Sequence, residues 1–403
     1  MPHTRRRVLA AVLALSAGAC TDATTVTTAP ADTSAPVRAA TYFVSPTGDD
    51  ANDGRSRATA FRTITRAGTV AQGGDVVEIA DGAYGNTRIV RSGRPEAYVV
   101  YRAATRWGAR VTGSGTLNAV DIDADYVEID GLEVTNPVGH CINGERHHHL
   151  RIRNNHTFGC GHSGITVGYS DFYLIEGNVT HGNARRGWYS GISVYEAADI
   201  GDASPGFHIV IRNNVAYDNI TDPAFGPHTD GNGIIVDDWN WTQNPGTPYP
   251  YTGLVENNLC YGNGGAGIKA AWSDNVTFRN NTAYDNNRDP ADPGTYRGGL
   301  YNQDSRNNVW VNNVSWADPT VNPNNSALMD RGPATGRSTV ANRWLNNVLW
   351  AGPSRSGVDI GDGSVPVLTG NLDRARPLFV APSRLGSADF RLAAGSPGLD
   401  MGT

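Results

Sequence analysis

Of the 33 lysine and arginine residues, one is a lysine, Lys269, which leaves 32 arginines. Arginine keeps its charge, whereas a lysine amine can lose its proton and act as a base. Among the carboxylates that precede Lys269 in the chain, Glu196, Asp230, Asp237 and Asp238 are the candidates for a shared site. Clustered carboxylates suit Ca²⁺, which takes six to eight oxygen ligands. These residue types predict a catalytic Lys269 and a metal site formed by the four carboxylates; the alternative is a set of solvated surface and turn residues.

Together, these groups would support β-elimination on an acidic, uronic-acid-containing polysaccharide. A bound Ca²⁺ would hold the sugar carboxylate and stabilise the charge that develops when the C5 proton leaves. The same cation would lower the pKa of the Lys269 amine by like-charge repulsion, so that the neutral amine takes the proton. Further side chains would clamp the carboxylate or stack on the sugar rings. The candidates for substrate binding are Arg185, Arg186, Arg297, Trp239, Trp241 and Tyr301.

Composition excludes several other classes of protein. Hydrophobic residues make up 39% of the chain, which contains 9 Trp, 16 Tyr and 9 Phe. It is too polar for a multi-span membrane protein and too aromatic for a disordered one. The net charge of −6 excludes nucleic-acid binding through a basic surface. An anionic ligand must therefore be held by local groups.

The N-terminus has the pattern of an export signal. Residues 1–20 combine three arginines, a short apolar run and small residues before Cys20, a pattern typical of a signal peptide. The cysteine resembles the acylated residue of a bacterial lipobox, and the alternative is ordinary cleavage near Ala19. Residues 21–40 are rich in Thr, Ala, Ser and Pro and predict a flexible tether. We expect an exported monomer that is either secreted or a cell-surface or periplasmic lipoprotein.

Beyond residue 100 the chain repeats itself. A short β-branched run ends in Asn-Asn or Gly-Asn, and a Gly-Ile unit follows. Asn155 to Gly164 is 9 residues and Gly164 to Asn178 is 14, and the same two spacings recur from Asn258. A period of 23 residues without a helical pattern predicts one coil of a parallel β-helix. The stacked asparagines are expected to form a side-chain ladder, and we expect seven to nine coils between residues 100 and 375.

The repeat also predicts where the candidate catalytic and metal-binding residues lie. If Ile234 and Ile268 point inward, then Lys269 points outward, one coil and two residues from Asp237, at roughly 8 Å. The coil that carries Lys269 is minimal, whereas its neighbours carry long insertions, which mark a working face. The insertions that should wall a groove around Lys269 are 179–190, 197–210, 218–231, 240–253 and 285–297.

Both ends of the repeat region resemble a known superfamily. The segment from Tyr42 to Tyr84 and the ending DFRLAAGSPGLDMGT resemble right-handed parallel β-helix proteins of the pectate-lyase-like superfamily. The resemblance implies an all-β solenoid over residues 41–403, with an N-terminal cap and first strands over 41–100, coils over 100–375 and a C-terminal cap over 376–403. We expect residues 61–71 to form a capping helix over the open end of the core.

Two enzyme classes share features with the region around Lys269. Gly267-Ile268-Lys269 resembles the strand that carries the base in family-nine pectate lyases, although the aspartates lie elsewhere in this chain. Thr229-Asp230-Gly231 and Asp237-Asp238 look like two polygalacturonase motifs, which implies an inverting hydrolase using Asp230, Asp237 and Asp238 as the alternative. A C5-epimerase and a non-catalytic carbohydrate-binding β-helix remain further alternatives.

Three cysteines follow the predicted signal peptide: Cys141, Cys160 and Cys260. An odd number permits at most one disulfide. Cys141 and Cys160 are the nearest pair in sequence, and the alternative is three separately buried thiols, because cysteine packs as a small hydrophobic residue.

Overall fold

The computed structural model describes residues 38–115, 118–136, 138–291, 298–332, 339–361, 363–383 and 388–399. The predicted signal peptide, most of the predicted tether, Cys20 and Arg297 lie outside these ranges. Among the described residues, no helix has both the length and the apolar character needed to cross a membrane.

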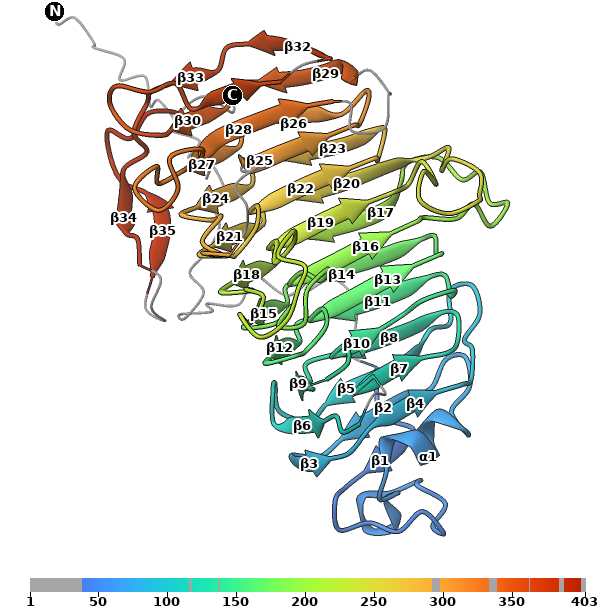
Figure 1. Cartoon of the computed structure of the whole chain (residues 1–403). Coiled ribbons are helices and arrows are strands. Elements are labelled where there is room, and N and C mark those ends of the chain that lie inside the picture. The colour runs from blue at the N-terminus through green and yellow to red at the C-terminus, as the bar shows by residue number, and fades with distance from the viewer. Residues whose placement is uncertain are drawn as a thin grey trace, which may run out of the picture.

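Three long parallel sheets wrap around one core and form a right-handed parallel β-helix, as predicted (Figure 1). Each regular coil supplies one strand to sheet C, then one to sheet A, then one to sheet B, as β22, β23 and β24 do. Sheet A contains β1 (Tyr42–Val44), β2 (Val76–Ile79), β5 (Val99–Ala103), β8 (Val127–Asp130), β11 (Leu150–Arg153), β14 (Tyr173–Glu176), β17 (Phe207–Arg212), β20 (Thr252–Glu256), β23 (Val276–Arg279), β26 (Val309–Val311), β29 (Thr339–Leu345) and β32 (Ser364–Thr369).

Sheets B and C complete the coils. Sheet B contains β3 (Gly82–Tyr84), β6 (Ala109–Thr112), β9 (Glu133–Thr135), β12 (His156–Phe158), β15 (Val179–His181), β18 (Val215–Tyr217), β21 (Leu259–Tyr261), β24 (Thr282–Tyr284), β27 (Val314–Trp316), β30 (Val348–Trp350) and β33 (Leu372–Asp373). Sheet C contains β4 (Thr87–Ile89), β7 (Val120–Ile122), β10 (Ile142–Asn143), β13 (Ile165–Gly168), β16 (Ile192–Tyr195), β19 (Ile234–Asp237), β22 (Ile268–Ala271), β25 (Gly298–Gln303), β28 (Ser326–Arg331) and β31 (Val358–Ile360).

The N-terminal end carries the predicted capping helix, but it is shorter than 61–71. After the 3₁₀ turn η1 (Arg57–Thr59), α1 spans Ile64–Gly68. It begins at Ile64 because the Thr63 hydroxyl accepts a hydrogen bond from the Arg66 amide at 3.0 Å. Phe61 is not helical, since it pairs with Val44 of β1 in a parallel bridge. Gly68 lies so close to β4 that an added Cβ would be 2.6 Å from the Arg88 carbonyl oxygen, which seats the helix on the first strand of sheet C.

Buried asparagines form the predicted ladder at the turn between sheets A and B. The Asn258 side chain donates to Asn281 Oδ1 at 3.0 Å, and its own Oδ1 accepts from the Asn214 side chain at 3.0 Å. The residue before each rung adopts a left-handed conformation, with φ of +57° at Asn213 and +54° at Asn257. Asparagine tolerates that region better than most side chains, which explains why the turn reads Asn-Asn. The rungs are Asn155, Asn178, Asn214, Asn258, Asn281, Asn313, Asn347 and Asn371.

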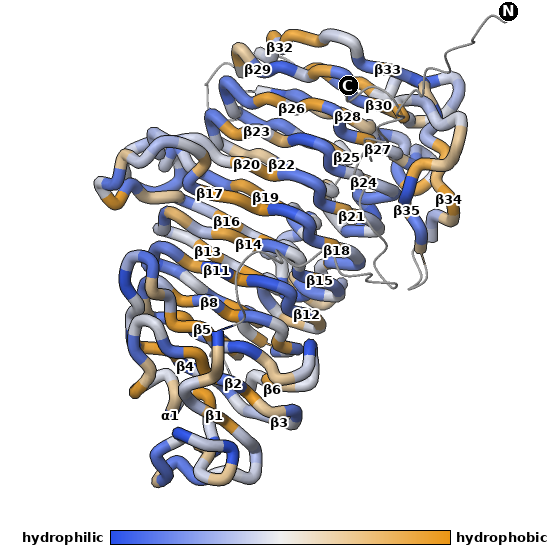
Figure 2. Tube along the Cα trace, turned by 180° about the vertical axis from the view of Figure 1, so that it is seen from behind, coloured by the Kyte–Doolittle hydropathy of each residue, from blue (hydrophilic) through white to orange (hydrophobic). Residues whose placement is uncertain are grey.

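Sheet C has the register predicted from the Gly-Ile units. Ile165, Ile192, Ile234 and Ile268 pair in one column, and all four are buried. The outward column beside them runs Thr166, Ser193, Ile235, Lys269 and Tyr301. Figure 2 shows hydrophobic residues recurring in successive stacked strands. A period of two along each strand therefore separates the core from the outer face of sheet C.

The antiparallel strands β34 (Phe379–Ala381) and β35 (Asp389–Leu392) pack on the outer face of sheet B, where Phe390 contacts the rings of Tyr261 and Tyr284. The segment predicted as a C-terminal cap thus covers a side of the solenoid.

Cys141 and Cys160 form a disulfide, and Cys260 is buried in the core.

Candidate functional site

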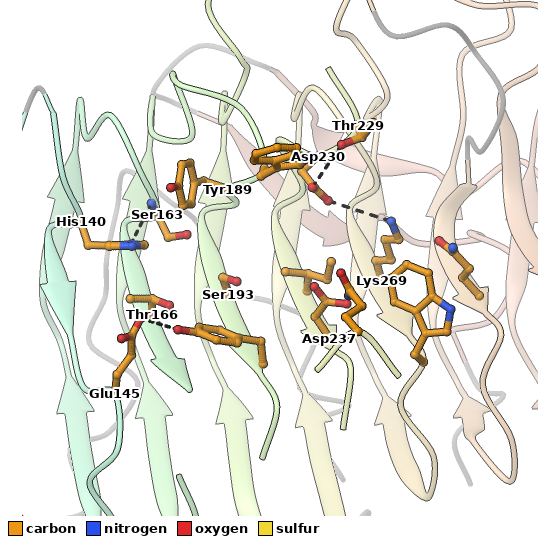
Figure 3. Close-up of a pocket in the computed structure, with 16 residues that line it drawn as sticks. His140, Glu145, Ser163, Thr166, Tyr189, Ser193, Thr229, Asp230, Asp237 and Lys269 are labelled. Atoms are coloured by element: carbon orange, nitrogen blue, oxygen red, sulfur yellow. Dashed lines mark hydrogen bonds and ion pairs between the residues drawn. The ribbon is translucent and has the colours of Figure 1, made fainter. Parts of the chain in front are cut away.

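A cavity of about 840 Å³ opens on the outer face of sheet C (Figure 3). Loops before β16, before β19 and after β19 form part of its wall, which confirms three of the five predicted insertions, 179–190, 218–231 and 240–253. The insertion at 197–210 and the described part of 285–297 contribute no lining residue. The residues that line it are His140, Glu145, Ser163, Thr166, Trp188, Tyr189, Ser193, Tyr195, Thr229, Asp230, Ile235, Asp237, Gln243, Lys269, Trp272 and Gln303.

Lys269 lies on the floor of this cavity, as the register predicts. Its side chain is 12% exposed, and Nζ lies 4.0 Å from Asp230 Oδ1. Nζ also lies 5.4 Å from the centre of the Tyr301 ring on the next coil. The ring face is electron-rich and attracts the ammonium form. Lys269 is therefore held at one position between a carboxylate and an aromatic ring.

Asp230 and Asp237 face the same cavity from neighbouring positions (Figure 3). Asp230 accepts hydrogen bonds from Asn232 Nδ2 at 2.9 Å and from the Thr229 hydroxyl at 3.4 Å. Asp237 Oδ1 is buried and has no hydrogen-bond partner among the described residues. Burial and the neighbouring Asp230 raise the pKa of Asp237 to about 7, although Lys269 opposes that shift. Near neutral pH the Asp237 carboxyl can therefore donate or accept a proton.

Asp238 and Glu196 do not join this pair, contrary to the predicted four-carboxylate metal site. Both follow the end of a strand in a left-handed conformation, with φ of +46° and +44°. Asp238 Oδ1 accepts from the amide and the hydroxyl of Thr242, each at 2.6 Å, and its Oδ2 accepts from the Gln243 amide at 2.8 Å. Glu196 accepts a hydrogen bond from the Asn244 side chain. Both carboxylates hold the loop that follows β19.

The remaining oxygens do not fit a preformed Ca²⁺ site. Ca²⁺ takes six to eight oxygen ligands, whereas two carboxylates, Asp230 and Asp237, face Lys269 across the cavity. One of them already pairs with the ammonium group. Across the described residues, no group of three or more His, Cys, Asp or Glu side chains is arranged to hold a metal ion.

None of the three predicted aromatic contacts lines the cavity. Trp239 is buried in the core, where its ring meets Tyr249 edge-on. Trp241 donates from Nε1 to the Ala197 carbonyl at 2.8 Å. Tyr301 is buried beneath Lys269. These three rings support the loops and the floor of the site, so the structure does not place them as sugar-stacking surfaces. Trp188, which is 68% exposed, and Trp272 line the cavity instead.

The predicted arginine clamp is also absent from the described lining. Arg185 pairs with Asp222 at 3.1 Å, and the Arg186 guanidinium lies 4.8 Å from the centre of the Phe225 ring. Both hold the loop before β19. Arg297, the third candidate, lies outside the described residues.

Three polar residues that were not selected as candidates from the sequence also line the cavity: His140, Glu145 and Tyr195. The Tyr195 hydroxyl donates to Glu145 Oε1. His140 accepts the Ser163 amide at Nδ1, at 3.2 Å, so its neutral ring carries its proton on Nε2. Burial lowers the pKa of His140 to about 3, which keeps the ring neutral. The cavity therefore has one end at Lys269, Asp230 and Asp237 and a hydroxyl-rich end at His140, where Glu145 is the one carboxylate among the described lining residues.

Glu145 could have been found from the register. The pairs Ile142–Ile165 and Asn143–Thr166 extend by two residues to place Glu145 beside Gly168. That position belongs to the outward column of Gly168, Tyr195 and Asp237. The missing signal was the Gly-Ile unit, because β10 follows Cys141 instead of glycine.

Comparisons with known proteins agree with this fold. The sequence profile of a family described as a protein of unknown function, DUF1565, matches residues 46–89. No curated protein matches the sequence.

Three solved structures share the architecture. Pectate lyase Pel9A is 16% identical, with a TM-score of 0.51 over 88% of this chain and 90% of its own. The A-module of the mannuronan C-5 epimerase AlgE6 from Azotobacter vinelandii is 16% identical, with a TM-score of 0.51 over 76% and 92%. XylC in complex with xylose is 12% identical, with a TM-score of 0.52 over 84% and 87%. These likenesses confirm the right-handed parallel β-helix fold.

Proposed function

We propose that this chain is a polysaccharide lyase that cleaves a uronate-containing glycan by β-elimination in the cavity over sheet C. The observation that carries the proposal is the convergence of Lys269, Asp230 and Asp237 on one open cavity from adjacent coils. Solved structures with the same fold include a pectate lyase and a mannuronan epimerase module, which supports a glycan as the substrate.

Lys269, Asp237 and Asp230 each have a separate role in the proposed elimination. The Lys269 amine takes the C5 proton of the uronate as a general base. The C–H electron pair forms the C4–C5 double bond, the C4–O bond breaks, and the departing oxygen takes a proton from water. The protonated Asp237 carboxyl donates a hydrogen bond to the sugar carboxylate and stabilises the charge that develops there. Asp230, 4.0 Å from Nζ, stabilises the ammonium group that results.

The calcium ion expected from the sequence has no role in this mechanism. Asp238 and Glu196 are committed to the loop after β19, and the proposed Asp237 hydrogen bond supplies the neutralisation that a cation would supply. We therefore expect cleavage to continue at an unchanged rate after chelation. A tenfold loss that added Ca²⁺ restores would contradict this part of the proposal.

The second candidate is an inverting glycoside hydrolase. The raised pKa of Asp237, about 7, also suits a general acid that protonates the glycosidic oxygen, with Asp230 as the base that activates water. Such an enzyme would release reducing ends without forming a double bond.

Product analysis separates the two candidates. The purified protein is incubated with pectate, alginate, glucuronan and glycans that mix uronate with neutral sugars, and reducing ends are counted alongside near-ultraviolet absorbance. β-Elimination yields an unsaturated uronide that absorbs, with one such group for each new reducing end. New reducing ends without absorbance would establish hydrolysis instead.

We also propose that the protein is exported and carries a lipid on Cys20. The arginines, the apolar run and the small residues before Cys20 support this proposal. Labelled fatty acid should enter the wild-type protein in bacterial cells but not a Cys20→Ala variant. Equal labelling of both, or of neither, would contradict acylation at Cys20.

A further inference from the structure

The charges around the cavity do not suit a chain of consecutive uronates. Lys269 is the one lysine or arginine among the described lining residues, whereas three carboxylates, Glu145, Asp230 and Asp237, line the same cavity. Each additional uronate would add a negative charge to an acidic surface. Like charges repel, most strongly where water is partly excluded. The cavity therefore has the means to hold one sugar carboxylate, at the end formed by Asp237 and Lys269.

The opposite end of the cavity is a built polar site. Lys269 lies on β22, four coils from β10, which corresponds to roughly 19 Å along the solenoid at about 4.8 Å a coil. The lining side chains at that end are His140, Glu145, Ser163, Thr166, Ser193 and Tyr195.

One hydroxyl in this site lacks a partner. Thr166 is 1% exposed, lines the cavity, and has no hydrogen-bond partner for Oγ1 among the described residues. A buried hydroxyl without a hydrogen bond costs free energy, so its position favours a ligand that supplies one. Figure 3 shows Thr166 beside Glu145, whose carboxylate is held by Tyr195.

We infer that the cavity end formed by Glu145, Thr166 and His140 is a subsite for an uncharged sugar residue. The inference rests on the proposed function and names its substrate: a glycan in which neutral sugars accompany the uronate, in place of a homopolyuronate. A sugar hydroxyl donates to the Glu145 carboxylate, and other hydroxyls exchange hydrogen bonds with Thr166 and with the Nε2–H of His140. A uronate in the same place would set its carboxylate against Glu145.

Binding measurements test the inference apart from catalysis. In a Lys269→Arg background, which keeps the cation, calorimetry compares a tetrasaccharide of uronates with one that alternates uronate and neutral hexose. We expect the alternating glycan to bind at least roughly tenfold more tightly. Glu145→Gln removes the repelling charge and keeps the shape, so the ratio of the two dissociation constants should fall toward one. Thr166→Val should weaken the alternating glycan alone.

Glu78→Gln, on β2 of sheet A and paired with Arg57, is the matched control and should leave the ratio unchanged. Equal or tighter binding of the homouronide, or a ratio that Glu145→Gln does not alter, would overturn the inference. If the protein cleaves a homopolyuronate by elimination and the ratio of the two dissociation constants is close to one, the proposed function stands and the subsite for an uncharged sugar does not. A clear preference for the alternating glycan without unsaturated product would keep the subsite and remove the lyase mechanism.

Discussion

Asp237 occupies the position where the proposed chemistry depends most on protonation. Its carboxyl points into the cavity, one of its oxygens is buried without a hydrogen bond, and Asp230 lies beside it. Burial and like-charge repulsion both favour the neutral carboxyl, which raises its pKa from 3.8 to about 7. The group donates a hydrogen bond below that pH and loses the donor above it.

We predict that wild-type kcat/KM falls as the pH rises above about 7, and that Asp237→Asn removes this fall. The amide donates at every pH, so the variant should retain at least about a tenth of the activity. A pH–rate profile of both proteins, with matched circular dichroism spectra, checks this. An inactive Asp237→Asn at every pH would show that Asp237 transfers a proton, as the hydrolase candidate requires.

The same group affects stability with a defined sign. Because its pKa is higher in the folded protein, Asp237 favours folding at a pH below 3.8 and loses this effect as the pH rises through about 7. Asp237→Asn should therefore stabilise the protein at pH 8, by about 2 kcal/mol, and change little at pH 4. Urea unfolding at both pH values measures the difference.

For single residues, the sequence predicted the position of a residue on its coil better than the direction in which its side chain points. Lys269, Asp230 and Asp237 lie together as the repeat spacing implies. Glu196 and Asp238 lie at equivalent positions of adjacent coils, each directly after the end of a sheet C strand. The left-handed backbone at both residues turns their side chains toward the following loop. Neither residue is asparagine or glycine, so the sequence carries no signal for that turn.

Among the elements, strands β10, β13 and β16 build the hydroxyl-rich end of the cavity, and the main contact there depends on a residue without a side chain, Gly168. Tyr195 of β16 reaches Glu145 by lying across Gly168 of β13. A Cβ at residue 168 would lie 2.5 Å from Tyr195 Cζ. A side chain there must push the ring away, so glycine at 168 is a requirement of the contact.

Gly168→Ala should break the Tyr195–Glu145 hydrogen bond and lower kcat/KM on a mixed glycan by about tenfold, the cost of one hydrogen bond to a charged group. Gly85→Ala is the control, because a Cβ there meets nothing within 4 Å. Steady-state kinetics on both variants measure the effect. Wild-type kinetics in Gly168→Ala would show that this contact does not shape the subsite.

The asparagine ladder sets the spacing of the coils. Asn258 is buried, donates to Asn281 Oδ1 and to the Ile211 carbonyl, and accepts from the side chain and amide of Asn214. Asn258→Ala should cost about 2–4 kcal/mol, because it leaves buried partners unsatisfied within a network. Asn324→Ala, in the exposed turn before β28, should change stability by less than about 0.5 kcal/mol. Comparable losses in both would contradict a structural ladder.

Repeat spacing predicted the elements well wherever the Asn-Asn unit is present. The count of seven to nine coils is confirmed at its upper end, since nine complete sets of one strand each from sheets C, A and B run from β7, β8 and β9 to β31, β32 and β33 in the described residues. The turn after β8 reads Asp130-Gly131 in place of Asn-Asn, so the earliest coils lack the signature. The helix expected over 61–71 begins only at Ile64, because Phe61 pairs with β1.

For the molecule as a whole, the disulfide and the stacked core stabilise the strands that form the cavity floor. Cys141 directly precedes β10 and Cys160 follows β12, so the bond closes one coil next to His140. The sequence separation is 19 residues. Replacing both cysteines with serine should lower the free energy of unfolding by about 3 kcal/mol through the entropy of the unfolded chain. Denaturant unfolding of the oxidised wild type and the double variant checks this; an unchanged midpoint would contradict it.

The central claim is that Lys269 removes a proton from a uronate in this cavity. The most direct measurement is the rate of near-ultraviolet absorbance on a uronate-containing glycan, in the wild type and in Lys269→Arg, with binding of the same glycan measured alongside. Arginine keeps the charge but cannot serve as the base, so the rate should fall by about 10²–10⁴-fold while binding stays within a few-fold. Undiminished elimination in Lys269→Arg would contradict the claim.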